Sequence, residues 1–238
     1  MTATIRPTVV PAAGVARKSA DPQAEMTAKF RASRLIPVIV IDDPADALPV
    51  ARALSDGGLP MAEITFRTPR ALESLTRITS ELPEMFVGAG TVLNNKQAVD
   101  AKNAGAKFIV SPGFNPAVVD YCRGEGLPVL PGVLTASEIE MGLEAGLNLL
   151  KIFPIEPAGG VAYLNAISSV FTSVEFTASG GITRENYLGY LGLKNVVAAG
   201  VLWIVSRDWI AAKEFDRIRD TVAGAVKSVA SLPAATAG

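Results

Sequence analysis

The sequence places one lysine inside an apolar strand, where it could form a covalent bond with a substrate. Lys151 has two apolar residues on each side, within the run formed by residues 148–154. Side chains alternate between the two faces of a strand, so Leu149, Lys151 and Phe153 share one face. Desolvation disfavours the charged form of an amine, and a neutral amine attacks ketones to form imines. The position predicts either an imine-forming lysine or a lysine that only pairs with a buried carboxylate.

A second predicted strand carries three polar residues at alternate positions. Glu63, Thr65 and Arg67 occur at i, i+2 and i+4, and they therefore share one face, opposite Ile64 and Phe66. A guanidinium can bind a substrate carboxylate through two parallel hydrogen bonds, and a buried glutamate can transfer protons. Glu63 and Arg67 could instead pair with each other for purely structural reasons. Together with the buried lysine, the three residues form a predicted reaction set.

Glycine-rich turns end three of the predicted strands. Thr91 closes a Gly-Ala-Gly-Thr turn, and Pro112 lies in a Ser-Pro-Gly-Phe turn. Glycine permits close approach of the backbone to a ligand, and a threonine hydroxyl can bind that ligand at the strand end. Gly180 and Gly181 precede a helix predicted to begin near Thr183, whose free N–H groups suit an anion such as phosphate. Each turn by itself is also compatible with a simple chain reversal.

These residues need strands that bring them to one place. From residue 35 onward, short apolar runs alternate with segments of helical periodicity. The eight runs are residues 35–41, 62–66, 86–90, 107–111, 128–132, 148–153, 174–178 and 195–200. This alternation predicts an α/β protein whose parallel sheet closes into a single (β/α)₈ TIM barrel. Catalytic groups of such barrels lie at the C-terminal ends of the strands.

The chain is expected to consist of an N-terminal extension, one barrel domain and a tail. Residues 1–30 are predicted to be partly disordered or helical, with a short helix near residues 26–31. Residues 31–230 are predicted to form the barrel, and residues 231–238 a flexible tail. A strand spacing of about 20–25 residues leaves no room for a second domain.

Local signals predict where some helices begin. Pro69 and Pro116 suit the first turn of a helix, where the missing N–H of proline has no partner to lose. Thr135 is followed three residues later by Glu138, the pattern of a capping box.

Composition excludes several classes of protein. The chain has 22 Lys plus Arg, 23 Asp plus Glu, a formal net charge of −1, no histidine and a single cysteine, Cys122. A near-neutral chain has no electrostatic footprint for nucleic acid or an anionic membrane. Without histidine there is no Ser-His-Asp triad and no histidine-ligated metal, so proton transfers would use Glu, Asp, Lys, Tyr or water. The longest apolar run, residues 196–205, is about half of a membrane span, and a cytoplasmic location is expected.

Six motifs resemble those of the 2-keto-3-deoxy-6-phosphogluconate (KDPG) and 4-hydroxy-2-oxoglutarate (KHG) aldolase family. Several motifs in register are far more specific than any one of them, and these follow the family order across residues 33–228. They are EITFRTP (63–69), VGAGTVLN (87–94), FIVSPGFNP (108–116), LPGVLTASE (130–138), KIFPIEPAGG (151–160) and SGGITRENY (179–187).

The resemblance implies a class I aldolase, a lyase, on a trimeric (β/α)₈ barrel. Such an enzyme cleaves a 2-keto-4-hydroxy acid, such as KDPG or KHG, to pyruvate and an aldehyde. Lys151 falls at the Schiff-base position of the family and Glu63 at the general acid–base position. The other matching positions bind the pyruvate part of the substrate or line its pocket: Arg67, Thr91, Pro112 and Phe153. The implied reaction needs no metal and no organic cofactor.

The sequence departs from the family after its last strand. The family usually has a Gly-Gly-Ser type of turn there, whose amides and hydroxyl help to hold the substrate phosphate. Here Val201 and Leu202 follow Gly200, so a hydroxyl and a flexible glycine are lost. Losing one hydrogen bond to a charged group costs about 1.5–3 kcal/mol. We therefore expect a weakened preference for the phosphorylated substrate, which favours KHG.

Two other functions remain compatible with the sequence. A phosphate-binding barrel isomerase or epimerase would use paired acid–base groups without a covalent lysine. A non-catalytic barrel could serve as a self-assembling scaffold, with an apolar association patch after the last strand. That patch would contain Val201, Leu202, Trp203, Val205 and Trp209. The aldolase prediction instead expects a keto acid and pyruvate as ligands and copies of the chain as partners, in a homotrimer or a higher assembly.

Overall fold

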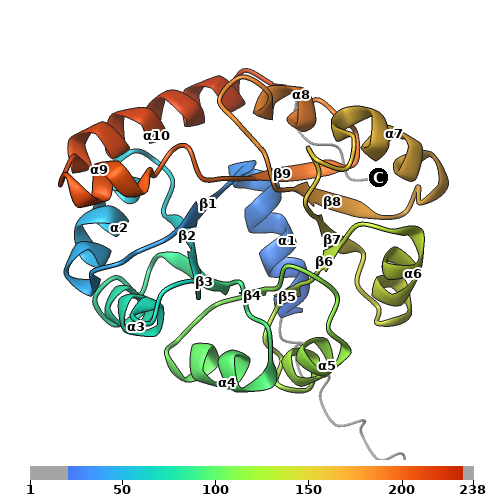
Figure 1. Ribbon diagram of the computed structural model, residues 1–238, viewed down its shortest axis with the longest axis horizontal. Coiled ribbons are helices and arrows are strands. Elements are labelled where there is room, and N and C mark those ends of the chain that lie inside the picture. The colour runs from blue at the N-terminus through green and yellow to red at the C-terminus, as the bar shows by residue number, and fades with distance from the viewer. Residues whose placement is uncertain (1–20, 233–238) are drawn as a thin grey trace, which may run out of the picture.

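Parallel strands form the centre of the molecule (Figure 1). The computed structural model describes residues 21–232, so most of the predicted N-terminal extension and tail lie outside the described residues. The strands are β1 (Leu35–Ile39), β2 (Met61–Thr65), β3 (Phe86–Gly90), β4 (Ile109–Val110), β5 (Val129–Leu130), β6 (Gly132–Val133), β7 (Leu149–Ile152), β8 (Glu175–Ala178) and β9 (Val196–Val201). They pair in the order β5-β4-β3-β2-β1-β9-β8-β7-β6.

The sheet closes where β5 and β6 meet. These strands stand at the two ends of the pairing order, yet only Pro131 separates them in the chain. On one side the Ser111 N–H donates to the Leu130 carbonyl at 3.3 Å, and on the other the Lys151 N–H donates to the Pro131 carbonyl at 2.9 Å. The run predicted as one strand at residues 128–132 forms two, because proline has no N–H to donate to a ladder. With this division, the predicted (β/α)₈ barrel is confirmed.

Helices surround the barrel, except for α1, which lies across its centre in this view (Figure 1). They are α1 (Pro22–Ser33), α2 (Ala47–Asp56), α3 (Ala71–Glu81), α4 (Asn95–Asn103), α5 (Pro116–Gly124), α6 (Ala136–Glu144), α7 (Gly160–Val170), α8 (Tyr187–Leu191), α9 (Arg207–Ala211) and α10 (Phe215–Ala230), with a 3₁₀ turn η1 (Pro44–Asp46) before α2.

Of the helix starts predicted from proline and capping signals, two are confirmed and one is wrong. Thr135 caps α6 in a capping box, and Pro116 is the first residue of α5. Pro69 instead lies in a turn that closes when the Ala71 N–H donates to the Thr68 carbonyl at 3.3 Å. Helix α3 therefore begins two residues after the predicted proline.

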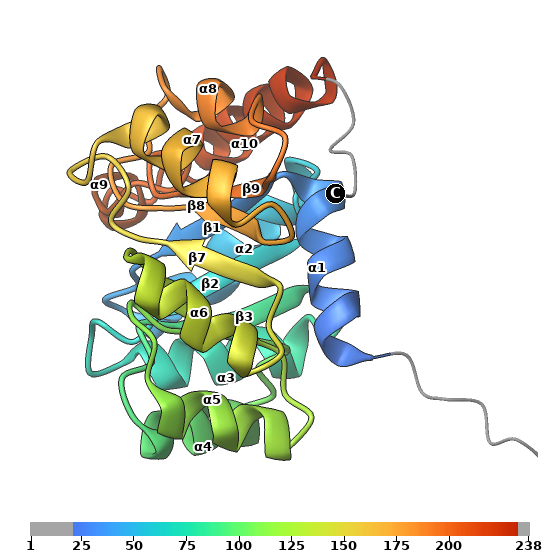
Figure 2. The same cartoon turned by 90° about the vertical axis from the view of Figure 1, so that its right-hand side faces the viewer.

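Helix α1 covers the end of the barrel where the strands begin (Figure 2). Its Met26 and Phe30 are fully buried in the core. The Gln23 amide group donates to the Val129 carbonyl at 2.9 Å and accepts from the Val129 N–H at 3.0 Å. Helix α1 includes the predicted helix at residues 26–31, and the predicted domain boundary after residue 30 falls inside it. The helix packs as part of the barrel because its apolar side chains fill the end where the strands begin.

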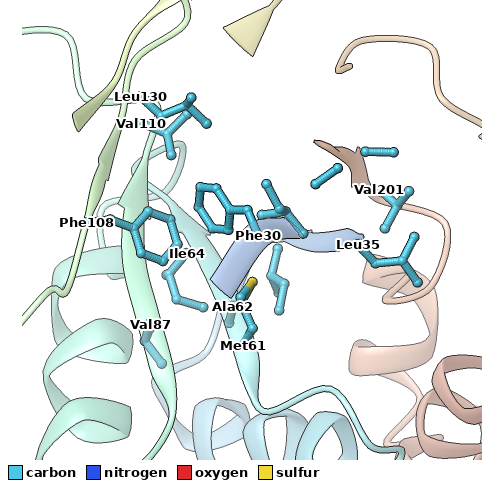
Figure 3. Packing of buried hydrophobic residues seen from close by; sticks show 14 of the residues in the cluster. Phe30, Leu35, Met61, Ala62, Ile64, Val87, Phe108, Val110, Leu130 and Val201 are labelled. Atoms are coloured by element: carbon cyan, nitrogen blue, oxygen red, sulfur yellow. The ribbon is translucent and has the colours of Figure 1, made fainter. Parts of the chain in front are cut away.

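Aromatic rings fill the same end of the barrel interior (Figure 3). The Phe30 ring meets Phe108 edge-on, with centroids 5.1 Å apart, and Phe86 stacks on Phe108 at 5.0 Å. A Cβ atom at Gly88 would overlap the Phe108 ring, so β3 needs glycine at this position. The aromatic packing closes one end of the barrel and leaves the other end for chemistry.

The apolar residues after β9 lie mainly in the core. Val201 and Val205 are buried, Trp203 and Trp209 are half-buried, and Leu202 is 39% exposed. These side chains therefore do not form the exposed association patch considered for a scaffold. Among residues 21–232, no helix combines the length and the apolar character needed to cross a lipid bilayer.

Candidate active site

Lys151 and Glu63 meet inside the barrel. Lys151 lies on β7 and Glu63 on β2, and their side chains are only 8% and 3% exposed. Lys151 Nζ lies 3.7 Å from Glu63 Oε1. Three strands separate β2 from β7 in the sheet, so the two side chains reach each other across the barrel interior. The alternation that predicted inward-facing positions for both residues is confirmed.

Glycine on the neighbouring strand makes room for the Glu63 carboxylate. Gly90 pairs in register with Thr65, and a Cβ atom at Gly90 would overlap Glu63 Oε1. Within the described part of the chain, Glu63 Oε1 is buried without a hydrogen-bond donor. A buried carboxylate oxygen without a donor is costly, and the cation that residues 21–232 place beside it is the amine of Lys151. The oxygen is therefore available to accept a proton or a hydrogen bond from a ligand.

The other polar residues of the second predicted strand take separate roles. The Thr65 hydroxyl is fully buried and donates to the Ile39 carbonyl at 2.9 Å, which makes it a structural contact. Arg67 is exposed at the end of β2, and its Nε donates to the Thr91 hydroxyl at 3.2 Å. Among the described residues, Glu63 forms its ion pair with Lys151 and not with Arg67. The arginine therefore keeps donors that can face a ligand.

Thr91 has an unusual backbone conformation directly after β3. Its φ angle is +57°, in the left-handed region that a β-branched side chain rarely adopts. A residue held in such a conformation costs about 1–3 kcal/mol, and such residues cluster at functional sites. The turn presents the Thr91 hydroxyl to Arg67 at the mouth of the barrel.

Phe153 lies close to the lysine, and Pro112 lies against the strand next to it. The Phe153 ring centroid is 5.2 Å from Lys151 Nζ, within range of a cation–π interaction. Gly132 on β6 is the register partner of Lys151, and a Cβ atom there would overlap the Pro112 carbonyl. Gly132 therefore lets the turn that contains Pro112 approach the strand beside the lysine. No sequence pattern indicated this role of Gly132, because it depends on a contact between distant segments.

Gly180 and Gly181 form a left-handed turn after β8, with φ angles of +90° and +86°. Helix α8 starts at Tyr187, so the predicted helix start near Thr183 is wrong. The Asn186 side chain accepts a hydrogen bond from the Thr183 N–H at 2.7 Å and holds that segment in a turn. Within residues 21–232, the N–H groups of Gly180 and Gly181 have no hydrogen-bond acceptor. Two adjacent unpaired amides still suit an anion, although no helix starts at them.

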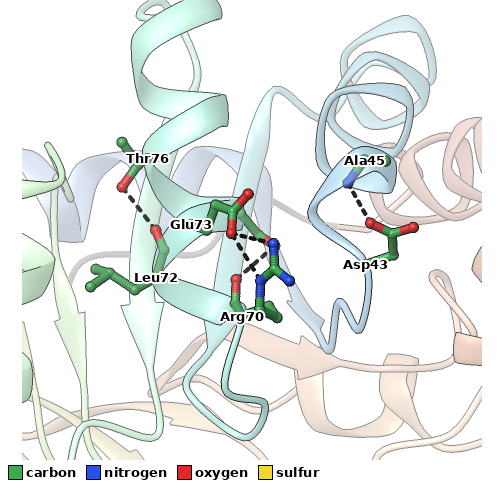
Figure 4. A network of polar contacts seen from close by, with 7 residues as sticks. Asp43, Ala45, Arg70, Leu72, Glu73 and Thr76 are labelled. Atoms are coloured by element: carbon green, nitrogen blue, oxygen red, sulfur yellow. Dashed lines mark hydrogen bonds and ion pairs between the residues drawn. The ribbon is translucent and has the colours of Figure 1, made fainter.

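Local contacts fix the segments that follow β1 and β2 (Figure 4). Arg70 Nε donates to Glu73 at 2.9 Å at the start of α3, and the Ala45 N–H donates to the Asp43 carboxylate at 2.9 Å. These groups are exposed, so each contact contributes little to stability. Among the described residues, no group of three or more Cys, Asp or Glu side chains could hold a metal ion.

The interior of the (β/α)₈ barrel holds a buried amine beside a carboxylate, an arrangement that suits imine chemistry. The sequence model described as KDPG and KHG aldolase matches residues 26–221. The chain therefore belongs to the KDPG and KHG aldolase family, and it is an aldolase of the Schiff-base type.

Individual relatives agree with this assignment. The 2-dehydro-3-deoxy-phosphogluconate aldolase of Treponema pallidum is 44% identical over 185 residues, covering 78% of this chain and 88% of the relative. The KHG/KDPG aldolase of Escherichia coli K12 is 41% identical over 195 residues, covering 80% and 92%. The crystal structure of KDPG aldolase from Legionella pneumophila, with pyruvate captured at low pH as a covalent carbinolamine intermediate, has a TM-score of 0.81 at 41% identity. It covers 83% of this chain and 96% of that chain. The comparisons favour the aldolase over the isomerase and the scaffold.

Proposed function

We propose that Lys151 is the residue that forms the imine with the C2 ketone of a 2-keto-4-hydroxy acid. The observation that carries this proposal is the buried approach of Lys151 Nζ to Glu63 Oε1 at 3.7 Å. The amine adds to the carbonyl carbon, and the carbinolamine, once a proton has been added to its hydroxyl group, loses water to give an iminium ion. The electron pair of the C3–C4 bond then moves toward the iminium nitrogen. An aldehyde leaves, and the enamine of pyruvate remains on the lysine.

Glu63 is the general acid and base of this proposal. Its Oε1 is buried, lacks a hydrogen-bond donor within the described chain and lies beside the amine. Through a water molecule, the carboxylate accepts the proton of the C4 hydroxyl as the C3–C4 bond breaks. The same proton is then delivered to C3 of the enamine, and hydrolysis of the imine releases pyruvate. Protons and electrons balance without a cofactor.

Arg67 and Thr91 bind the carboxylate of the substrate in this proposal. They lie together at the barrel mouth, and the exposed guanidinium retains donors for a carboxylate. Phe153 and Pro112 enclose the reacting ketone beside Lys151. Holding the carboxylate in one orientation brings C2 to the amine, which removes much of the entropic barrier to addition.

The distal end of the substrate binds at the unpaired amides of Gly180 and Gly181. Leu202 is exposed after β9 and supplies no hydroxyl to a phosphate. We therefore expect a weaker preference for KDPG over KHG than a full set of donors would give. Measured kcat/KM values for the two substrates test this, and a strong preference for KDPG would contradict it.

The family resemblance also supports a homotrimer, and we propose a cytoplasmic location. Light scattering of the purified full chain tests the assembly. A mass of three chains is expected, a multiple of that mass would indicate a higher assembly of trimers, and a monomer would contradict the proposal.

Borohydride trapping with pyruvate tests the role of Lys151. Borohydride reduces an imine to a stable secondary amine, so we expect a permanent pyruvate adduct on the peptide that contains Lys151. Lys151→Met keeps an apolar side chain of similar length in the barrel and should lose both the adduct and the aldol cleavage. Lys194→Ala removes an exposed lysine and serves as the control, with adduct and cleavage unchanged. A fully active enzyme without an adduct would exclude the proposed mechanism and favour acid–base chemistry alone.

A further inference from the structure

Glu156 joins the segment after β7 to the segment after β8. It lies five residues after Lys151, and its Oε1 accepts hydrogen bonds from the Tyr190 hydroxyl and from Asn186 Nδ2, the latter at 3.0 Å. Tyr190 is fully buried on α8. Burial, together with the hydrogen bond and the charge of the Glu156 carboxylate, raises the pKa of the Tyr190 hydroxyl, which therefore remains a proton donor at all physiological pH values. The proposed mechanism gives Glu156 no part in bond making or breaking.

The same two segments are also joined through their backbones. The Ile155 N–H donates to the Ser179 carbonyl at 2.9 Å, and the Glu156 N–H donates to the Gly180 carbonyl at 3.0 Å. The Asn186 amide that reaches Glu156 also donates to the Gly181 carbonyl at 3.0 Å. The Gly180 carbonyl is therefore held by the backbone N–H of Glu156. The Gly181 carbonyl is held by the Asn186 amide, which also donates to the Glu156 carboxylate.

The Glu156 side chain also packs directly on the turn. A Cβ atom at Gly181 would overlap the Glu156 Cβ, so the turn approaches this side chain as closely as glycine allows. The Gly180 N–H shares a planar peptide unit with the Ser179 carbonyl, and the Gly181 N–H shares one with the Gly180 carbonyl. Because these two carbonyls accept from the Ile155 and Glu156 N–H groups, the orientation of both glycine N–H groups is fixed as well.

We propose that Glu156 is a positioning residue that holds the Gly180–Gly181 turn at a set distance from Lys151, so that the turn can receive the distal anionic group of the substrate. This inference rests on the proposed function, in which Lys151 forms the imine and the two glycine amides bind the distal anion. Glu156 does not touch the reacting atoms. Its role concerns the distal anionic group of the substrate, which pyruvate does not have.

Two reactions with different substrates separate this role from a general structural one. Trapping of pyruvate by borohydride needs Lys151 but no distal group, whereas cleavage of KDPG needs both. For Glu156→Ala we expect kcat/KM for KDPG to fall about 10- to 100-fold, mainly through KM, because small displacements of binding groups have effects of this size. The pyruvate trapping rate should stay within about twofold of the parent value. A change of that size is much smaller than the loss of at least about tenfold expected for kcat/KM with KDPG.

Three further variants make the test specific. Asn186→Ala should reproduce the selective loss, because it removes the contacts to both Glu156 and Gly181. Glu156→Gln keeps an acceptor oxygen and should restore most of kcat/KM for KDPG. Glu185→Ala removes the same charge from an exposed position in the neighbouring turn and should leave kcat/KM for KDPG unchanged.

The outcomes that overturn the inference are distinct from failure of the proposed function. Unchanged kcat/KM for KDPG in Glu156→Ala and Asn186→Ala overturns it. An equal loss of cleavage and trapping also overturns it, because that result indicates a damaged fold. Failure of the parent enzyme to trap pyruvate at all would instead refute the role of Lys151, and the inference about Glu156 would fall with it.

Discussion

At the scale of single residues, the site combines two buried charges with few other polar partners. Moving a carboxylate and an ammonium out of water is costly, and a pair at 3.7 Å recovers that cost only if further hydrogen bonds satisfy both groups. Glu63 Oε1 lacks such a bond within the described residues. The Lys151–Glu63 pair therefore contributes little to stability. A substrate that donates a hydrogen bond to Glu63 and forms an imine with Lys151 reduces the cost of burying the two groups.

The position of Glu63 depends on the absence of a side chain at Gly90. In Gly90→Ala the new methyl group would overlap Glu63 Oε1, and the carboxylate must move away from the amine. We expect kcat for aldol cleavage to fall at least about tenfold, because a general base must lie within reach of its proton. Crowding should also lower the free energy of unfolding by about 1–3 kcal/mol.

Steady-state kinetics and urea unfolding check both effects of Gly90→Ala. Gly189→Ala, at an exposed position of helix α8, is the matched control, because no heavy atom lies within 4 Å of the added methyl group. A kcat equal to that of the parent in Gly90→Ala would mean that the carboxylate is not needed at its present position.

At the scale of elements, period-two patterns predicted which faces of β2 and β7 point inward. Both strands are continuous and fully buried, so alternation alone decides where each side chain points. The helix start near Thr183 was wrong, because the Asn186 side chain bonds the Thr183 N–H and favours a turn that competes with the helix. The division at Pro131 also escaped prediction, since it depends on strand pairing between segments far apart in sequence.

The capping box at the start of α6 gives a test at this scale. The Glu138 N–H donates to the Thr135 hydroxyl at 3.4 Å, and the Glu138 carboxylate accepts from the Thr135 N–H at 2.8 Å. We expect Thr135→Ala to lower the free energy of unfolding by about 1 kcal/mol, as loss of a helix cap does. Urea denaturation measures the change, and kcat/KM should remain that of the parent.

A second threonine provides the control for the cap. The exposed Thr76 hydroxyl bonds the Leu72 carbonyl within α3 (Figure 4), and Thr76→Ala should change stability by less than about 0.5 kcal/mol. Equal effects of the two substitutions would show that the capping box contributes nothing specific.

Burial and the capping hydrogen bonds have opposite effects on the pKa of the Glu138 carboxylate. Desolvation raises the pKa of Glu138, but the hydrogen bonds from the Thr135 and Leu134 N–H groups and from the Thr135 hydroxyl outweigh it and lower the pKa below its ordinary value. A lowered pKa contributes stability at neutral pH that is lost as the carboxylate is protonated in acid. The stability difference between the parent and Thr135→Ala should therefore shrink below about pH 4.

At the scale of the whole molecule, α1 covers one end of the barrel (Figure 2), where the aromatic cluster also packs, and the site occupies the other end. The barrel itself was predictable, because each strand–helix unit has a local pattern. The approach of Lys151 to Glu63 was predictable only as two inward-facing positions, since the distance across the interior depends on closure between β5 and β6. Gly90 and Gly132 leave room for groups from other segments. No sequence pattern predicted this, because a local pattern does not indicate contacts between distant strands.

Cys122 reports on the integrity of this whole packed structure. Its side chain is fully buried on α5, and desolvation raises the pKa of the thiol from 9.0 to about 12. The thiolate is the reactive form, so the native protein should react slowly with a disulfide reagent at neutral pH and quickly after unfolding in urea. Rapid reaction of the native protein would show that α5 is not packed as described.

The same shift makes stability depend on pH in alkaline solution. Above the unfolded pKa near 9 the unfolded chain loses the thiol proton while the folded chain keeps it, so the free energy of unfolding falls as pH rises toward 12. One thiol can contribute a slope of up to about 1.4 kcal/mol per pH unit. Cys122→Ala removes this contribution and leaves the tyrosines in place. Urea unfolding at pH 8, 9.5 and 10.5 should show a steeper loss of stability in the parent than in Cys122→Ala, and parallel curves would contradict the raised pKa.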